Sequence, residues 1–142
     1  MKVKDIMTQQ VIRIQAEETV DVAARTLAQY NIGALPVCDH SGKLCGVVTD
    51  RDLVTRCVAS GRNAGQTAVR DVMTGRVVTI GPEMEVGVAA HLMGREQVRR
   101  LPVVENGRLV GMISLGDLAR SHRYDMEAAQ ALCDITENVI IR

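Results

Sequence analysis

Two short motifs place an aspartate three residues after a hydroxyl side chain, directly behind an apolar stretch. They are GVVTDRD at 46–52 and GMISLGD at 111–117. This spacing is typical of a capping box, in which Thr49 or Ser114 caps a helix and the aspartate answers it. It also suits a ligand, because a helix N-terminus favours phosphate and the ionised Asp52 or Asp117 could accept both hydroxyls of a ribose. The spacing alone leaves both interpretations open, and the cap needs no ligand.

A second candidate site is the arginine pair Arg99 and Arg100, just before a Leu-Pro-Val sequence at 101–103. Arginine binds phosphate oxygens through two parallel hydrogen bonds, so the pair could clamp a phosphate. The alternative is two solvated side chains at the start of a strand. The earlier Leu-Pro-Val at 35–37 follows Gly33 and Ala34 instead. Two sites built on these stretches would therefore differ. In the first site, Arg51 partly compensates for the missing arginine pair. The second site has Gly116 at the position of Arg51.

No residue pattern supports catalysis. His40, His91 and His122 are isolated along the chain, and each is more often a surface residue than a base or ligand. There is no glycine-rich phosphate loop, dinucleotide fingerprint or serine elbow. We therefore expect no enzyme, no catalytic cofactor and no metal site.

The four cysteines, at positions 38, 45, 57 and 133, form no CxxC pair. We expect small buried apolar side chains in a reducing cytoplasm. Cys38 and Cys45 flank a short turn, so a redox role for this pair stays open as the alternative.

These candidate sites belong to a unit that the chain contains twice. Between 3–37 and 69–103, at an offset of 66, 14 of 35 positions are identical, and the match resumes after a one-residue deletion. A repeated unit usually buries its apolar face against its copy. We expect a first motif over 1–60, a linker over 61–68, a second motif over 69–123 and a tail over 124–142.

Each copy is predicted to run β-α-β-β-α, from its apolar spacing and turn residues. Asn106-Gly107 is a strong hairpin signal. The tail has an apolar stripe that predicts an additional helix over about 124–138, packed on the body or on a second subunit. The predicted strands cover 11–14, 34–38, 44–48, 77–80, 100–104 and 109–113. The predicted helices cover about 17–30, 49–59, 85–95 and the residues from 114 on.

Composition narrows the possible partners. Lys and Arg together number 17, as do Asp and Glu, so the net charge is zero. This balance argues against nucleic acid and anionic membranes, which attract basic surfaces. Tyr30 and Tyr124 are the only aromatic residues, so the core must be aliphatic. With no long apolar run or signal core, we expect a cytoplasmic protein.

The tandem unit resembles a pair of CBS domains over about residues 3–123. Three segments carry the resemblance in both copies: D-[IV]-M-T at the start, L-P-V in the middle, and G-h-h-[ST]-x-x-D (h, apolar) before the last helix. It is similar to the small bacterial proteins that consist only of such a pair, including stress- or hypoxia-induced ones. The resemblance implies two pseudo-symmetric α+β motifs packed as one module, usually paired into a flat homodimer.

The resemblance also implies an adenosyl ligand in clefts between the motifs: AMP, ADP, ATP, NAD or S-adenosylmethionine, with AMP or ATP favoured. Asp52 and Asp117 would hold the ribose, and Thr49 and Ser114 would lie at the ribose and phosphate. The residues implied to meet the base or phosphate, or to line the same pockets, are Gly33, Ala34, Arg99, Arg100, Thr8 and Thr74. The chain is thus expected to be a regulatory ligand sensor. The alternative is a nucleotide-independent interaction or dimerisation module of a stress response, acting on an unidentified protein target.

Overall fold

The computed structural model describes residues 1–121 and 125–137, which form two compact units. One unit comprises residues 12–77, and the other joins residues 1–11 to the chain from residue 78 onward. Each unit combines helices with a small sheet and has its own buried aliphatic cluster. The mixed α+β class and the aliphatic core predicted from the sequence are therefore confirmed.

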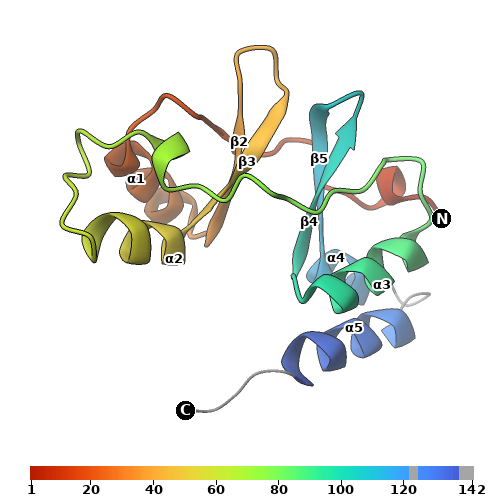
Figure 1. The fold of residues 1–142 in the computed structure, drawn as a ribbon. Helices are drawn as coiled ribbons and strands as arrows, with labels where there is room; N and C mark the ends of the chain where they lie inside the picture. Colours follow the sequence, from red (N-terminus) through yellow and green to blue (C-terminus); the bar gives the residue numbers. More distant parts are fainter. Residues whose placement is uncertain (122–124, 138–142) are drawn as a thin grey trace. The chain divides into compact units, whose positions relative to one another are not determined.

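The unit of residues 12–77 is built on a three-stranded sheet in the order β1-β2-β3. Its elements are β1 Ile14–Gln15, α1 Val20–Tyr30, β2 Ala34–Cys38, β3 Leu44–Thr49, α2 Asp50–Asp52, the π-helix η2 Leu53–Val58 and the 3-10 helix η3 Val69–Asp71. β1 is parallel to β2, and β2 and β3 form the antiparallel hairpin visible in Figure 1. α1 buries Val20, Ala23 and Leu27, which stand at helical spacing. It ends at Asn31, whose left-handed φ of 51° closes the helix.

The helix predicted over 49–59 forms in two parts, one α-helical turn followed by η2. The amide of Ala59 bonds the carbonyl of Val54, five residues back. The Thr55 hydroxyl also donates to the Arg51 carbonyl, at 2.8 Å. Such a back-bond competes for the acceptor of the next helical turn, and a widened π turn satisfies the backbone instead.

The second unit is built on the hairpin of β4 and β5. Its elements are the 3-10 helix η1 Val3–Asp5, α3 Val86–Glu96, β4 Arg100–Glu105, β5 Arg108–Ser114, α4 Leu115–Arg120 and α5 Asp125–Glu137. The hairpin turns at Asn106 and Gly107, both with positive φ (54° and 79°), as the sequence predicts for this dipeptide. The predicted tail helix is present as α5, and its outermost predicted positions, 124 and 138, lie outside the described residues.

The strand predicted over 77–80 is wrong. Only Ile80 pairs, through a single parallel bridge to Val103. The next residues are Gly81 and Pro82, and a proline donates no backbone hydrogen bond and restricts the residue before it. The ladder therefore cannot continue past Ile80, and the structure gives no comparable local reason for the lack of pairing at 77–79. In the first copy the strand is equally short and lies at Ile14–Gln15 instead of 11–14.

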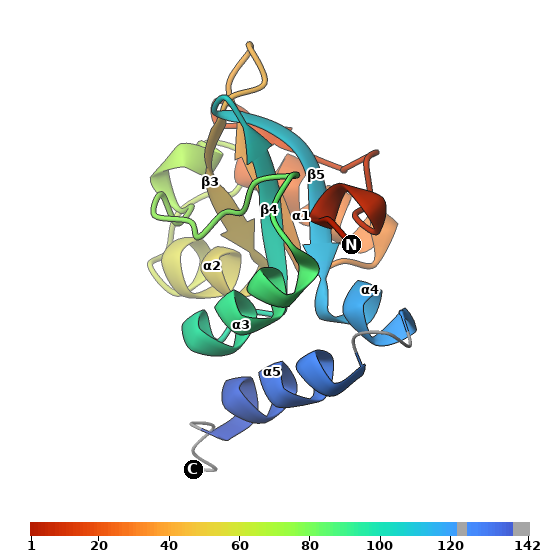
Figure 2. The same cartoon turned by 90° about the vertical axis from the view of Figure 1, so that its right-hand side faces the viewer.

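α5 packs on both α3 and α4, as Figure 2 shows. Ala131 of α5 is 2% exposed and belongs to the core of this unit. Gly94 of α3 makes the close approach possible, because a Cβ there would lie 2.7 Å from Oδ2 and 3.1 Å from Cβ of Asp134. The tail predicted to pack on the body or on a second subunit therefore covers its own unit.

Each copy donates its first segment to the unit that holds the rest of the other copy. Val3 and Lys4 donate backbone hydrogen bonds to Met84 and Pro82, at 2.8 and 3.0 Å. Thr8 exchanges two backbone bonds of 2.9 Å with Met112. The same pattern recurs in the other unit, where the partners are Val69 with Glu18, Arg70 with Ala16, and Thr74 with Val47. Each spatial unit therefore combines the first segment of one sequence copy with the remaining residues of the other copy.

This exchange explains why a glycine is the first residue of both GVVTDRD and GMISLGD. A Cβ on Gly46 would lie 2.5 Å from the carbonyl oxygen of Thr74, and one on Gly111 would lie 2.9 Å from that of Thr8. Neither backbone carbonyl can move away without breaking the pairing beside it. The glycine is thus required by a close approach of two backbones.

We predict that Gly94→Leu destabilises the protein, because the added side chain meets Asp134 and Ala131 of α5. The expected loss of unfolding free energy is about 1–3 kcal/mol, as for other overpacked sites. Urea denaturation of the two proteins measures it. Gly87→Leu is the matched control on the same helix, since nothing lies within 4 Å of a Cβ there. It should be neutral or stabilising, and equal losses in both variants would contradict this account of Gly94.

The N-terminal segment is also held by ion pairs, with Lys2 and Lys4 bonding the two carboxylate oxygens of Glu83 at 2.6 and 2.9 Å. These bonds lower the pKa of Glu83 from its ordinary 4.5 to about 2. A carboxylate with a depressed pKa stabilises the fold above its unfolded pKa, and this stabilisation is lost as the pH falls through the folded pKa.

We therefore predict that Glu83→Gln is less stable than the unchanged protein at pH 7, by an amount that shrinks below pH 4.5 and vanishes near pH 2. Urea denaturation across this pH range tests it, at low salt because screening weakens exposed pairs. Glu17 holds the corresponding position in the first copy, where Ala68 stands for Lys2. Glu17→Gln should show no such pH-dependent difference. A Glu83→Gln effect that is constant from pH 7 to pH 2 would exclude the ion pairs as its cause.

Candidate functional site

Both capping boxes predicted from the sequence form. The Thr49 hydroxyl accepts the Asp52 amide at 3.1 Å, and the Asp52 carboxylate accepts the Thr49 amide at 3.0 Å. Ser114 and Asp117 repeat this exchange at 3.1 and 2.8 Å. In each box the aspartate uses Oδ2 for the cap. The structural role is therefore confirmed, and Oδ1 of each aspartate takes no part in the cap.

The residues before the Leu-Pro-Val strands lie beside these helix starts. The carbonyl of Gly33 accepts the amide of Asp50 at 3.0 Å, and that of Arg99 accepts the amide of Leu115 at 2.8 Å. In the strand register Ala34 stands opposite Thr49, and Arg100 stands opposite Ser114. The structure thus gathers the predicted site residues into two similar groups, one in each unit.

Thr8 and Thr74, which were predicted to line the sites, lie next to each group and not within it. Thr8 and Thr74 are exposed and pair with Met112 and Val47, two residues before the hydroxyls of the caps. Their segments flank β5 and β3 through the exchange described above. Arg51 is also exposed, and its amide bonds the Asp50 side chain at 2.7 Å.

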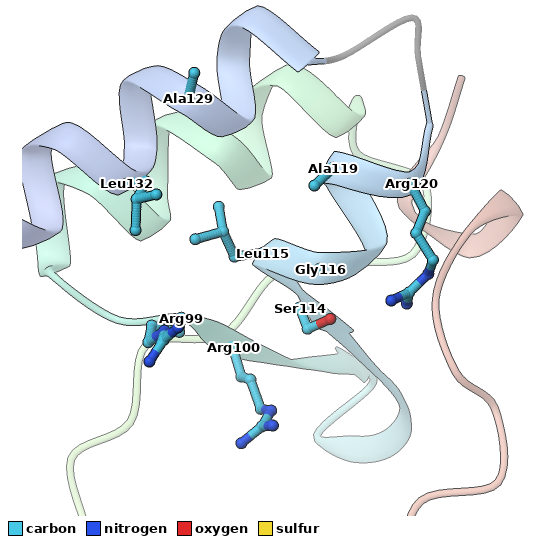
Figure 3. A pocket seen from close by; sticks show the side chains of 9 residues that line it. All are labelled: Arg99, Arg100, Ser114, Leu115, Gly116, Ala119, Arg120, Ala129 and Leu132. Atoms are coloured by element: carbon cyan, nitrogen blue, oxygen red, sulfur yellow. The ribbon is translucent and has the colours of Figure 1, made fainter.

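The group around Ser114 opens onto a pocket of about 800 Å³ (Figure 3). The start of β4 and the turn before α4 contribute Arg99, Arg100, Ser114 and Leu115. α4 and α5 contribute Gly116, Ala119, Arg120, Ala129 and Leu132. Neither Thr8 nor Asp117 is among the residues that line this pocket, although Asp117 is bonded to the lining residues Ser114 and Arg120. A volume of this size accommodates a nucleotide-sized molecule.

The pocket is divided between a polar side and an apolar side. Arg100, Ser114 and Arg120 lie on the side of the strands, whereas Leu115 and Leu132 point into the space between α4 and α5 (Figure 3). The three arginines favour an anion, because guanidinium groups bind phosphate and carboxylate oxygens through paired hydrogen bonds. The leucines offer an apolar surface to a flat group. The arrangement suits a ligand with an anionic end and an apolar end.

Sequence reasoning missed Arg120 and the wall made by α5. Arg120 donates to Oδ1 of Asp117, three residues earlier on α4. The i, i+3 spacing of opposite charges was a usable signal for this pair. Ala129 and Leu132 had no such signal, since the tail lies outside the repeat and its packing partner is a tertiary feature.

The corresponding group in the other unit carries different charges. Five positions differ in charge: Gly33, Ala34, Asp50, Arg51 and Thr55 stand where the pocket has Arg99, Arg100, Leu115, Gly116 and Arg120. The Asp50 carboxylate also lies near Gly33, with Oδ2 3.5 Å from the position of a Cβ there. The first group thus has a carboxylate near the place where the second has arginines. The prediction that the two sites differ in phosphate binding stays a prediction, and the carboxylate of Asp50 is a physical reason for it, because it repels an anion at the first group.

The cysteines are all free thiols. Cys38 and Cys57 are buried as expected, Cys45 is half-buried, and Cys133 is exposed on α5, which the sequence did not predict. Burial raises the pKa of the Cys38 thiol, which keeps it protonated and unreactive at neutral pH.

The described residues also lack a metal-binding cluster and a membrane-spanning helix. Within 1–121 and 125–137, no three His, Cys, Asp or Glu side chains are grouped so that they could hold a metal ion. Over the same ranges, no helix has the length and apolar character needed to cross a bilayer. His40 and His91 are exposed, and His122 lies outside the described residues.

Comparison with known proteins identifies the repeat. The family model of the CBS domain matches twice, over residues 3–59 and 69–123. The chain is 42% identical over 138 residues to the CBS domain-containing protein YhcV of Bacillus subtilis, covering 97% of each protein.

Two solved structures share the fold. Hypoxic response protein I, crystallised with two coordinated zinc ions, matches with a TM-score of 0.78 and 30% identity over 85% of this chain and 98% of that one. CBSX2 in complex with AMP matches with a TM-score of 0.76 and 29% identity over 88% of this chain and 98% of that one. The predicted similarity to small stand-alone proteins of the stress-response type is thereby confirmed.

Proposed function

Since the chain belongs to the CBS domain family, we propose that it is a regulatory module whose second motif binds an adenine nucleotide or a related adenosyl ligand. The observation that carries the proposal is the pocket in which Arg99, Arg100 and Arg120 lie beside the apolar surface of Leu115 and Leu132. The complex of CBSX2 with AMP supports the ligand class.

The proposal assigns a part of the ligand to each side of the pocket. The adenine lies against Leu115 and Leu132, where aliphatic side chains take the place of aromatic ones. The ribose hydroxyls bond Oδ1 of Asp117, the oxygen that the cap leaves free. The phosphate binds Arg99 and Arg100. AMP or ATP fits this assignment better than S-adenosylmethionine, whose sulfonium would meet the arginines with like charge.

The proposed role is binding without catalysis. The residues that line the pocket include no histidine or cysteine, and their one hydroxyl, Ser114, already accepts a bond in the cap. The neighbouring Asp117 carboxylate is bonded by the Ser114 amide and by Arg120. We further propose that the protein acts in the cytoplasm as a homodimer that transmits ligand occupancy to a protein target.

A second candidate function is a nucleotide-independent interaction module. The observation that favours it is an exposed apolar pair on η2, Val54 and Val58, with 58% and 69% of their surface exposed. Residues four apart share one face of a helix, so the pair presents a small apolar surface in the unit of residues 12–77. This surface would serve self-association or a protein partner.

We predict that AMP, ADP, ATP, NAD or S-adenosylmethionine raises the melting temperature in a thermal-shift screen, with the phosphate-bearing ligands giving the larger shifts. A ligand at about 100 times its dissociation constant stabilises the folded state by about 2.7 kcal/mol, which is several degrees for a chain of this size. Asp117→Asn should lose the shift, because the amide keeps an oxygen for the cap but removes the charge that binds the ribose.

Asp52→Asn is the matched control, since Asp52 closes the same box in the other unit. It should keep the shift. An equal loss in both variants would contradict the assignment to the second motif. No shift with any ligand would favour the interaction module, and sedimentation velocity of Val58→Glu against the unchanged protein would then test whether η2 carries self-association.

A further inference from the structure

Arg120 occupies the carboxylate oxygen that the ribose needs. Its guanidinium donates to Oδ1 of Asp117, while Oδ2 of the same carboxylate accepts the Ser114 amide. The Asp117 side chain is only 10% exposed, whereas that of Arg120 is 73% exposed. Both oxygens of a nearly buried acid are therefore engaged, and the partner on Oδ1 is an exposed side chain.

The chain makes room for this contact at Gly116. A Cβ there would lie 3.2 Å from Nη1 of Arg120 and 3.6 Å from the Ser114 hydroxyl. The first motif reverses the two residue types, with Arg51 in place of Gly116 and Thr55 in place of Arg120. In the first motif Arg56 pairs with Asp52 instead, with Nε 3.8 Å from Oδ1. In the second motif Arg120 bonds the aspartate and also lines the pocket.

A carboxylate oxygen has two lone pairs, so two ribose hydroxyls that both bond Oδ1 of Asp117 displace the guanidinium of Arg120. The consequence depends on the rest of the ligand. A phosphate-free adenosyl ligand takes Oδ1 and leaves the guanidinium without an anionic partner. A phosphorylated ligand takes Oδ1 but brings a new anion into the pocket that Arg120 lines with Arg99 and Arg100. Figure 3 shows the side chains of Arg100 and Arg120 extending on the same side of the pocket.

We propose that Arg120 is a specificity-determining residue that exchanges Asp117 for the ligand phosphate, and so makes the pocket select phosphorylated adenosyl ligands over phosphate-free ones. The proposal rests on the proposed function of the second motif. It names the class of ligand that this pocket accepts and the residue that rejects the other class.

Isothermal titration of the full chain with AMP and with adenosine tests the exchange. Arg120→Gln should weaken AMP binding by about tenfold or more, the size of one hydrogen bond between charged groups. Adenosine binding should stay the same or tighten, because the variant frees Oδ1 of Asp117. The preference for AMP over adenosine therefore falls. Arg120→Lys, which keeps the charge, should retain part of that preference.

Arg95→Gln is the control for a lost charge in the same unit, because Arg95 pairs with Glu96 on α3 outside the pocket lining. Its preference for AMP should match that of the unchanged protein. Equal weakening of AMP and adenosine by Arg120→Gln would reduce Arg120 to a structural role and overturn the exchange. Unchanged affinities would overturn it as well. If the unchanged protein binds neither ligand, the proposed function fails, and the exchange fails with it.

Discussion

The close approach of two backbones at Gly46 and at Gly111 is the constraint on which both units depend. At each glycine the first segment of the other copy pairs with the strand, and a Cβ would collide with a carbonyl of that segment. The strand then continues for three residues to the hydroxyl that caps the next helix. The position of each capping box, and of the aspartate within it, is therefore set by a pairing that begins at a glycine.

The repeat keeps this backbone frame and changes the charges on it. Equivalent hydrogen bonds recur in the two units, down to the carbonyls of Gly33 and Arg99 that hold the helix starts. The side chains around them differ, with Asp50 near one and arginines around the other. Backbone hydrogen bonds do not depend on which side chains are exposed beside them. Two copies can therefore share a fold while only one has several arginines around its helix start. A duplicated frame can thus carry one anion site and one group of a different kind.

Local sequence signals predicted the local structure. The Asn106-Gly107 hairpin, the stripe of α1 and both capping boxes depend on residues within a few positions of each other, so their spacing alone was sufficient. The strand over 77–80 failed because the alternating apolar residues outweighed the proline that follows. The exchange of first segments was beyond prediction for another reason: the copies are so alike that Val3 and Val69 could each pair with either one.

The site was predictable to the same extent. Arg99, Arg100, Ser114 and Asp117 were identified because the repeat placed them next to a cap and a strand start. Leu132 and Ala129 were not, since a pocket wall contributed by a helix outside the repeat depends on how α5 packs on α3, which Gly94 allows. Arg120 lay within reach of the helical spacing rule, through its bond to the carboxylate of Asp117.

The exchange also sets the order in which the chain can complete its structure. Residues 1–11 leave the ribosome before the residues they pair with, and Met112, the partner of Thr8, is made more than a hundred residues later. The segment of 69–77, in contrast, meets a unit that has already emerged. One unit can therefore close during synthesis, whereas the other keeps its opening strand edge unpaired until the second hairpin is complete. Late-closing pairs of this kind fold slowly and expose an edge to neighbouring chains.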